Sequence, residues 1–192
     1  MSATTTLCPG LSELVARLDS AVEAETTEQI TARVKAELED FLGRAALTLP
    51  DRFRVTRADS YARRLLHQDP GQKYIAVVMT WAPGQGTPVH DHGGLWCVEG
   101  VVEGEMTVTQ YDVQPEADGF RVRALGAPLS AGVGTAGRLI PPTDYHVLAN
   151  AQPDITSITL HVYGGNLEGC RIFTPRDDGR YQQSIRALTY QD

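Results

Sequence analysis

The chain has 192 residues, of which 42% are hydrophobic, and it carries a formal net charge of −7 at pH 7. This length and apolar content are those of one soluble globular domain, and no stretch reaches the ~18 consecutive apolar residues of a membrane span. The acidic balance argues against a polyanionic partner, so we expect binding neither to nucleic acid nor to a membrane.

The first fifty residues show helical periodicity. Apolar residues recur at helical spacing from Leu11 to Leu18, with Ser12 as a candidate N-cap. Between Thr27 and Leu42 the charges occupy the other faces of a single apolar row made of Ile30, Val34, Leu38 and Leu42. We expect residues 1–50 to form helices that pack on the outside of the domain.

After Pro50 the pattern changes to short strands. The runs Tyr61–His67 and Lys73–Trp81, separated by a turn at residues 69–72, predict a β-hairpin. Gly or Pro turns separate most of the further candidate strands, which are Trp96–Val102, Glu105–Tyr111, Phe120–Ala124, Arg138–Ile140, Tyr145–Asn150 and Ile155–Tyr163. So many short strands predict a mainly β fold, a sandwich or barrel. We expect one domain over residues 1–192, with the β core at about residues 55–175.

The cysteines and the N-terminal residues give an expectation about the cellular compartment. Cys8, Cys97 and Cys170 are irregularly spaced and form no CxxC pair, which argues against a disulfide framework or a zinc knuckle. Residues 1–6 lack the basic and apolar regions of a signal peptide. We therefore expect a cytoplasmic protein with free thiols.

The segment His90-Asp91-His92 is the most specific chemical signal in the chain. Alternate residues of a strand share a face, so the two imidazoles would point the same way and chelate a metal. His146, which begins a strand after a proline turn, is the best third ligand. Nitrogen ligands suit Fe(II), Zn, Ni or Cu, so the ligand type alone does not choose the metal.

These histidines resemble the metal site of the cupin superfamily, whose fold is a small β-barrel or jelly roll. The positions that match its first motif are Gly84, His90, His92 and Gly104, and those that match its second are Pro141, His146 and Asn150. Two positions depart from the pattern. Trp96 and Cys97 stand where the usual glutamate ligand falls, and Thr143 replaces a glycine. The resemblance thus implies a metal held by three neutral imidazoles, with several coordination positions open.

Among cupins, the chain resembles the cysteine dioxygenase family over about residues 55 to 175. The segment Thr159-Leu160-His161-Val162-Tyr163 resembles the family's Ser-x-His-x-Tyr triad, and strand parity places its alternate residues on one face. In that arrangement His161 would orient the Tyr163 hydroxyl, and Thr159 would fix the tautomer of His161.

The resemblance also concerns the cysteines. In some members a cysteine at the position of Cys97 is cross-linked through sulfur to the active-site tyrosine, here Tyr163, while many bacterial members have glycine there. A thioether is therefore implied as possible. Cys97 has the opposite strand parity to the histidine pair, so a break or bulge at Gly93-Gly94 would have to turn it inward. Cys170 matches a family cysteine near the barrel opening.

Substrate choice in the family depends on one position. Arginine there marks cysteine dioxygenases, and glutamine marks 3-mercaptopropionate dioxygenases; the matching residue here is Arg63. Tyr61 and Arg63 share a strand face, and a guanidinium inside a barrel suits a substrate carboxylate. A slip of one residue in register would instead place Arg64 inside.

The resemblance implies a bacterial-type cysteine dioxygenase that uses Fe(II) and dioxygen to convert L-cysteine to cysteine sulfinate, and we expect it to be a monomer. No external electron donor is needed, because the thiol supplies the electrons. The implied roles are metal binding by His90, His92 and His146, substrate binding by Arg63 and Tyr61, and catalysis by Tyr163, His161, Thr159 and Cys97.

Three alternatives remain open. A 3-mercaptopropionate dioxygenase fits every feature of the core except Arg63. A zinc or manganese cupin isomerase would be expected to use the missing glutamate. A metal-binding cupin sensor without catalysis is the alternative from outside enzymology, and the acidic N-terminal helices argue against it.

Overall fold

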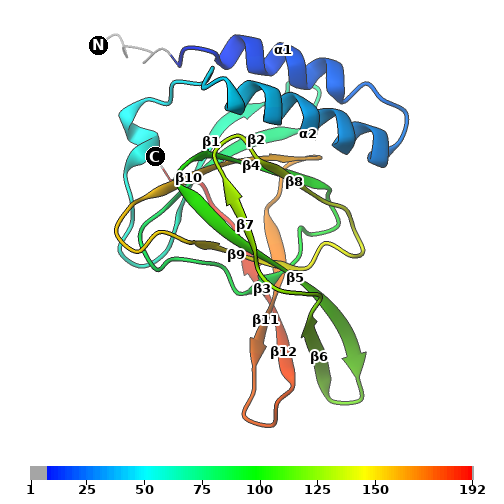
Figure 1. Cartoon of the computed structure of the whole chain (residues 1–192). Coiled ribbons are helices and arrows are strands. Elements are labelled where there is room, and N and C mark those ends of the chain that lie inside the picture. The colour runs from blue at the N-terminus through cyan, green and yellow to red at the C-terminus, as the bar shows by residue number, and fades with distance from the viewer. Residues whose placement is uncertain (1–7, 192) are drawn as a thin grey trace.

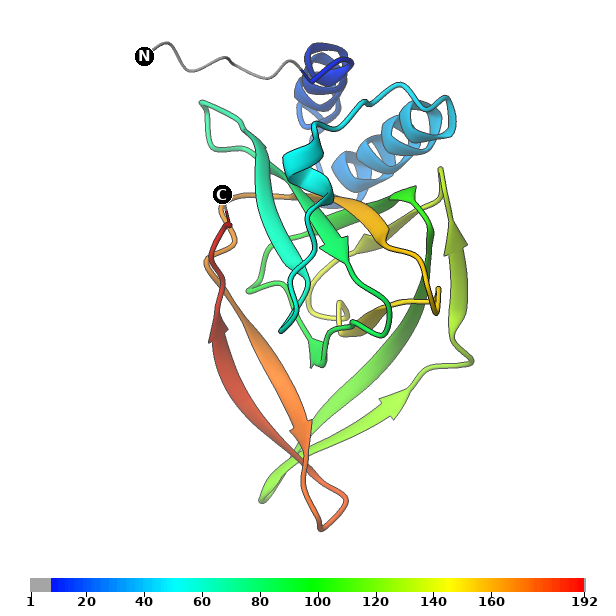
Figure 2. The same ribbon diagram turned by 90° about the vertical axis from the view of Figure 1, so that its left-hand side faces the viewer.

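The computed structural model describes residues 8–191. Within them, two helices and a short 3₁₀ turn (Asp51–Arg54) precede twelve strands arranged in two antiparallel sheets. The sheets face each other as a small barrel with both helices on one side, and two hairpins extend beyond it (Figure 1 and Figure 2). The expected mainly β, cupin-type fold with an N-terminal helical segment is confirmed.

The first sheet has the strand order β1 (Ala62–Gln68), β2 (Ile75–Trp81), β10 (Ser157–Tyr163), β4 (Cys97–Glu103) and β8 (Ala136–Leu139). The second sheet has the order β6 (Gly119–Ala124), β12 (Tyr181–Ala187), β11 (Gly169–Pro175), β3 (Val89–His90), β9 (His146–Asn150), β5 (Glu105–Glu116) and β7 (Leu129–Gly132).

Helices α1 (Leu11–Ala21) and α2 (Thr27–Gly43) begin in different ways. A capping box starts α2, because Thr26 Oγ1 accepts from the Gln29 backbone N–H while the Gln29 side chain accepts from that of Thr26. The residue that caps α1 is Gly10, at φ 89°, so the expectation that Ser12 is its cap is wrong. A Cβ at Gly10 would lie 2.0 Å from the Ala46 carbonyl oxygen, which explains the glycine.

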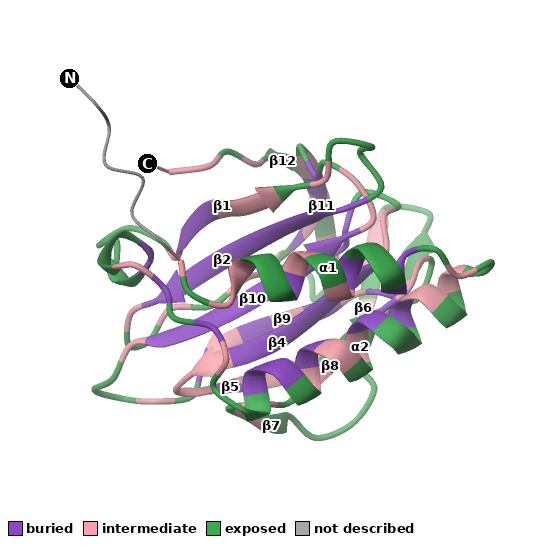
Figure 3. Cartoon of the chain, turned by 90° about the horizontal axis from the view of Figure 1, so that it is seen from above, coloured by how far each residue is buried: buried purple, intermediate pink, exposed green. Residues whose placement is uncertain are grey.

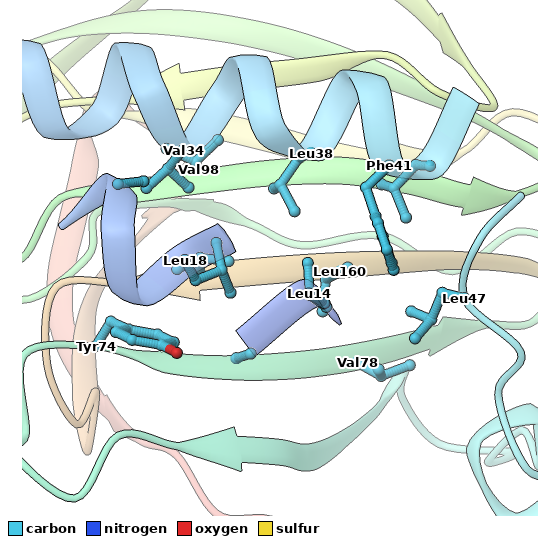
Figure 4. Packing of buried hydrophobic residues seen from close by; sticks show 14 of the residues in the cluster. Leu14, Leu18, Val34, Leu38, Phe41, Leu47, Tyr74, Val78, Val98 and Leu160 are labelled. Atoms are coloured by element: carbon cyan, nitrogen blue, oxygen red, sulfur yellow. The ribbon is translucent and has the colours of Figure 1, made fainter. Parts of the chain in front are cut away.

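Both helices cover the outer face of the first sheet (Figure 3). Leu14 and Leu18 of α1 and Leu38 of α2 point down onto strand residues of this sheet (Figure 4). The sheet residues that face the helices are Tyr74, Ala76, Val78, Val98, Ile158, Leu160 and Val162.

The opposite face of the first sheet lines the barrel interior. The alternate residues of β2, β4 and β10 lie there, because side chains alternate along a strand. They form a second apolar cluster that includes Ile75, Val77, Met79, Trp81, Cys97, Val101 and Tyr163. Covered on both faces, β2 and β10 are buried along their whole length.

The chain continues the sheet beyond the expected end of the core near residue 175. Strand β12 pairs with β11 as far as Ala187. Residues 188–191, here called the C-terminal strap, then return to β1. Gln191 donates its backbone N–H to the Arg63 carbonyl oxygen at 2.8 Å, and its Oε1 accepts from the Arg63 backbone N–H at 2.5 Å. No helix in the described part of the chain is both long and apolar enough to cross a membrane.

Candidate metal centre

The three candidate metal ligands meet inside the barrel. His90 ends β3 and pairs across the sheet with His146, the first residue of β9. His92 lies beyond β3, so the expectation that His90 and His92 share one strand face is wrong. The chain leaves the sheet after His90 and turns at Gly93 and Gly94, whose φ values are 60° and 83°. The turn nevertheless brings the imidazoles of His90 and His92 close together.

The imidazole nitrogens are arranged as a metal would require. The Nε2 atoms of His90 and His146 are 3.2 Å apart, and one ring nitrogen from each of the three histidines lies within 4.8 Å of the others. The cavity that they line has a volume of about 20 Å³, which is room for a single atom of the size of a water.

In two of these rings an oxygen atom lies close to Nδ1. His90 Nδ1 lies 3.1 Å from the Pro88 carbonyl oxygen, and His92 Nδ1 lies 2.9 Å from Asp144 Oδ2. The same Asp144 oxygen accepts from the His92 backbone N–H at 3.0 Å. Such partners leave Nε2 of each ring free to bind a metal. Asp144 is missing from the sequence-based site, although its position two residues before His146 is a usable signal.

Burial favours the neutral form of the His90 and His146 imidazoles, which is the form that binds a metal. It lowers the pKa of His90 to about 3, with the neighbouring His92 adding to the shift. It also lowers the pKa of His146 well below its ordinary value, and the three nearby histidines add to that shift. The donor set therefore fits a divalent metal that accepts nitrogen ligands.

Glu99 is a second residue that sequence reasoning missed. It lies on β4 two residues after Cys97, is only 7% exposed, and points into the barrel. Its Oε1 lies 3.5 Å from His146 Nδ1 and its Oε2 lies 3.4 Å from His161 Nδ1. Burial raises the pKa of its carboxyl to about 8. A lone acid in an apolar strand, at the parity of Cys97, is the signal that could have found it.

The Thr159, His161 and Tyr163 side chains do lie on one face of β10, inside the barrel. Thr159 Oγ1 is 2.7 Å from His161 Nε2, and it accepts from the Trp81 indole N–H at 2.9 Å. The His161 and Tyr163 rings are nearly parallel, at 15°, with centroids 6.0 Å apart. Because the two nitrogens of His161 face Thr159 and Glu99, the arrangement differs from the expected bond to the Tyr163 hydroxyl.

Cys97 and Tyr163 are cross-strand neighbours on β4 and β10. Burial raises the pKa of the Cys97 thiol and of the Tyr163 phenol well above their ordinary values. The break in the chain that would turn Cys97 inward is present as the turn at Gly93 and Gly94.

Arg63 is buried at 3% exposure on the inner face of β1, opposite Met79. Its guanidinium lies between the rings of Tyr163 and Tyr190, at 5.8 and 4.6 Å from their centroids. One nitrogen, Nη2, donates to the Leu167 carbonyl oxygen at 3.2 Å. Nε and Nη1 have no hydrogen-bond partner among the described residues. Arg64 lies on the other face of β1, opposite Val78.

A wider cavity of about 520 Å³ leads from the surface to Arg63 and Tyr61, with Arg186 and the strap on its wall. Tyr61 also lines the small cavity at the histidines, so it stands between the two spaces. Its ring lies against Trp81, with centroids 4.4 Å apart. The structure therefore brings Arg63 and Tyr61 together at the mouth of the metal site.

A double-stranded β-barrel whose interior holds three histidines that could bind a metal is the architecture of a cupin. The match to the family model "Cysteine dioxygenase type I" extends over residues 5–176, and the chain belongs to this family.

Curated relatives include cysteine dioxygenase type 1 of Danio rerio, 22% identical over 125 residues that cover 60% of this chain and 57% of that protein. The protein of the same name from Rattus norvegicus is 22% identical over 116 residues, which cover 60% of this chain and 56% of that protein. The chain thus spans a little more than half the length of these relatives.

Solved structures with a similar fold include a protein with a double-stranded β-helix domain from Klebsiella pneumoniae. It is 17% identical, the match covers 72% of this chain and 88% of that one, and the TM-score is 0.47. A protein from Thermus thermophilus is 21% identical over 60% of this chain and 92% of that one, with a TM-score of 0.44.

Proposed function

We propose that the protein is a thiol dioxygenase that uses mononuclear Fe(II) and dioxygen to convert L-cysteine to cysteine sulfinate. Family membership supports the dioxygenase class, and the state of Arg63 supports the substrate. A buried guanidinium with two unpartnered nitrogens, beside a metal centre, calls for a bidentate anion such as a carboxylate.

Fe(II), when bound, would supply the redox chemistry that oxidation of a thiol by dioxygen requires. Zinc lacks this redox chemistry, whereas three imidazoles suit Fe(II). His90, His92 and His146 would hold the ion. In the reaction both atoms of dioxygen end on sulfur, which loses the four electrons that dioxygen gains, so no other reductant takes part.

The remaining residues position the substrate. Arg63, with Tyr61, would hold the carboxylate of cysteine and so direct its thiol and amine toward the histidines. Tyr163 would donate a hydrogen bond to the reacting groups, because burial raises the pKa of its phenol and keeps it protonated at neutral pH.

Oxygen uptake by the Fe(II)-loaded protein with cysteine, 3-mercaptopropionate and cysteamine tests the proposal. We expect uptake with cysteine in a one-to-one ratio to sulfinate formed, and weak uptake with cysteamine, which lacks the carboxylate. Preferred uptake with 3-mercaptopropionate would support the alternative substrate. Metal binding without uptake for any thiol would support a sensor and contradict the proposal.

We further propose a thioether between Cys97 and Tyr163, which the cross-strand pairing of the two residues and the burial of both side chains support. A carbon–sulfur bond would form at the phenol ring as the thiol and the ring each lose a hydrogen, with dioxygen as the oxidant. The intact mass should then be lower by two hydrogens. A Cys97→Ala variant, which cannot form the bond, provides the unlinked reference.

A monomer in the cytosol remains our expectation, and Cys8, Cys97 and Cys170 are free thiols in the structure, which fits a reducing compartment. Light scattering of the purified protein would give the mass in solution, and a dimer mass would contradict the first half of this expectation.

A further inference from the structure

We propose that Glu99 is a positioning residue that joins the metal site to the His161 cluster by accepting a hydrogen bond from His146 Nδ1 and another from His161 Nδ1. The inference rests on the metal site of the proposed function, but on no step of the dioxygenase reaction. Glu99 acts through His146, because its oxygens do not belong to the group of ring nitrogens that converge on the metal position.

Three buried polar atoms near Glu99 lack a close hydrogen bond among the described residues. They are His146 Nδ1, His161 Nδ1 and Glu99 Oε2. They face one another across 3.4 to 3.5 Å, with Glu99 in the middle. Buried polar groups in folded proteins are nearly always paired. A small movement of the Glu99 side chain would pair all three, and no other described residue offers them a partner at this distance.

The direction of the hydrogen bonds around His161 can be derived starting from Trp81. The indole N–H of Trp81 is only a donor, so Thr159 Oγ1 accepts from it at 2.9 Å. The Thr159 hydroxyl hydrogen is then available to His161 Nε2 at 2.7 Å. If His161 Nε2 accepts, its proton is on Nδ1, which faces Glu99 Oε2.

The other carboxylate oxygen of Glu99 extends the series of hydrogen bonds to the metal site. Glu99 Oε1 faces His146 Nδ1, and an imidazole that donates from Nδ1 has its Nε2 lone pair free. That Nε2 is the atom 3.2 Å from His90 Nε2. Glu99 would thus do for His146 what Asp144 does for His92 at 2.9 Å. Carboxylate partners of this kind fix the ring orientation and raise the basicity of the ligand.

Long-range ¹H–¹⁵N spectra of the zinc-loaded wild-type protein test the tautomers without any variant. Zinc replaces iron because it is diamagnetic. We expect His146 and His161 both to carry the proton on Nδ1. A proton on Nε2 of His161 would reverse the direction of the hydrogen bond between Thr159 and His161 and overturn the proposal.

Glu99→Gln tests the link to the metal. Its amide nitrogen cannot accept, so one of the two imidazoles must lose its bond or change tautomer. We expect the affinity for Zn²⁺, measured by competition with a chelator, to fall by about 10- to 100-fold, together with a changed tautomer in the spectrum. Glu103→Gln makes the same change on β4 at a partly exposed site bound to Arg54, and should leave the affinity unchanged.

Unchanged zinc affinity in a folded Glu99→Gln variant would overturn the proposal, as would an equal loss in both variants. Circular dichroism establishes whether the variant folds, and the wild-type spectrum decides the case if it does not. The outcome is independent of dioxygenase activity. A protein that shows the expected tautomers but takes up no oxygen would disprove the proposed function and leave this inference intact.

Discussion

At the scale of single residues, the proposed metal site includes the almost fully buried imidazole of His146. His146 is 1% exposed and faces His90 across 3.2 Å. We predict that His146→Ala lowers metal affinity by at least about 100-fold, because losing a ligand exceeds the loss of a supporting partner. Metal analysis after dialysis measures it. His67→Ala is the matched control, since His67 packs on Tyr74 away from the site. Full metal retention by His146→Ala would contradict the ligand assignment.

Arg63 gives a prediction about substrate affinity. Removing its guanidinium costs the charged hydrogen bonds to the carboxylate, about 1.5–3 kcal/mol, or roughly 10- to 100-fold in KM for cysteine. We predict that Arg63→Ala has this effect on cysteine and a much smaller one on cysteamine, as measured by oxygen uptake. Arg64→Ala, on the opposite face of β1, should leave both KM values unchanged. Equal effects of Arg63→Ala on the two thiols would show that Arg63 does not bind the carboxylate.

Strand parity could place Arg63 on the inner face of β1, because the alternation of side chains along a strand is a local property. It failed for His92, which lies beyond the end of β3. Parity placed Thr159, His161 and Tyr163 together, and they do line the barrel. It could not tell which nitrogen of His161 faces which partner. That depends on Glu99, which faces His161 Nδ1, and on Trp81, which donates to Thr159. These two residues come from two other strands and reach the cluster only in the folded barrel.

At the scale of elements, the turn after β3 sets the direction of His92. A Cβ on Gly93, at φ 60°, would lie 2.7 Å from the Gly169 carbonyl oxygen, whereas one on Gly94, at φ 83°, meets nothing within 4 Å. Both alanine variants carry backbone strain of about 1–3 kcal/mol, but only Gly93→Ala must also move the chain. We predict a larger loss of unfolding free energy and weaker metal binding for Gly93→Ala, measured by urea denaturation and zinc titration.

Equal losses in the two glycine variants would show that backbone strain alone, and not the contact with Gly169, governs the turn. A loss of stability in Gly93→Ala with unchanged zinc affinity would show that the turn does not direct His92 toward the metal.

Elements with a strong local pattern were predictable, and those defined by distant partners were not. The β1–β2 hairpin and α2 follow from turn residues and apolar periodicity. β3 has two residues, and it is a strand only because β9 and β11 flank it. β12 is mostly exposed, so its sequence lacks the apolar alternation that marks a half-buried strand. The C-terminal strap contacts Arg63, which is distant in the sequence, so no local sequence pattern predicts this contact.

At the scale of the whole molecule, the first sheet divides two environments. Its outer face and the helices form an apolar core, while its inner face carries buried polar groups. Among these are Arg63, Glu99, Thr159 and His161, all at most 7% exposed. Burying so many polar groups is costly unless they are paired or bind a ligand. The fold therefore ties the stability of the barrel to the protonation of its interior.

This coupling predicts how the metal-free protein responds to acid. The folded state keeps His90 neutral down to a pKa of about 3, whereas the unfolded chain takes up that proton near pH 6.5. Burial also lowers the pKa of His146 and of His161. Below pH 6.5 the unfolded state binds more protons, so the unfolding free energy falls as the pH falls, by up to about 1.4 kcal/mol per pH unit for each imidazole.

Glu99 has the opposite effect in the metal-free protein, because burial raises the pKa of its carboxyl from 4.5 to about 8, whereas the hydrogen bonds that we propose from His146 and His161 favour the carboxylate and reduce this shift. One carboxyl opposes three imidazoles, so we predict a net fall in the melting temperature of the metal-free protein from pH 6.5 to pH 5. Thermal denaturation followed by circular dichroism measures it. His90→Gln removes one of the three imidazoles and should show a shallower fall. A melting temperature that stays constant or rises toward pH 5 would mean that these imidazoles take up protons without unfolding the barrel.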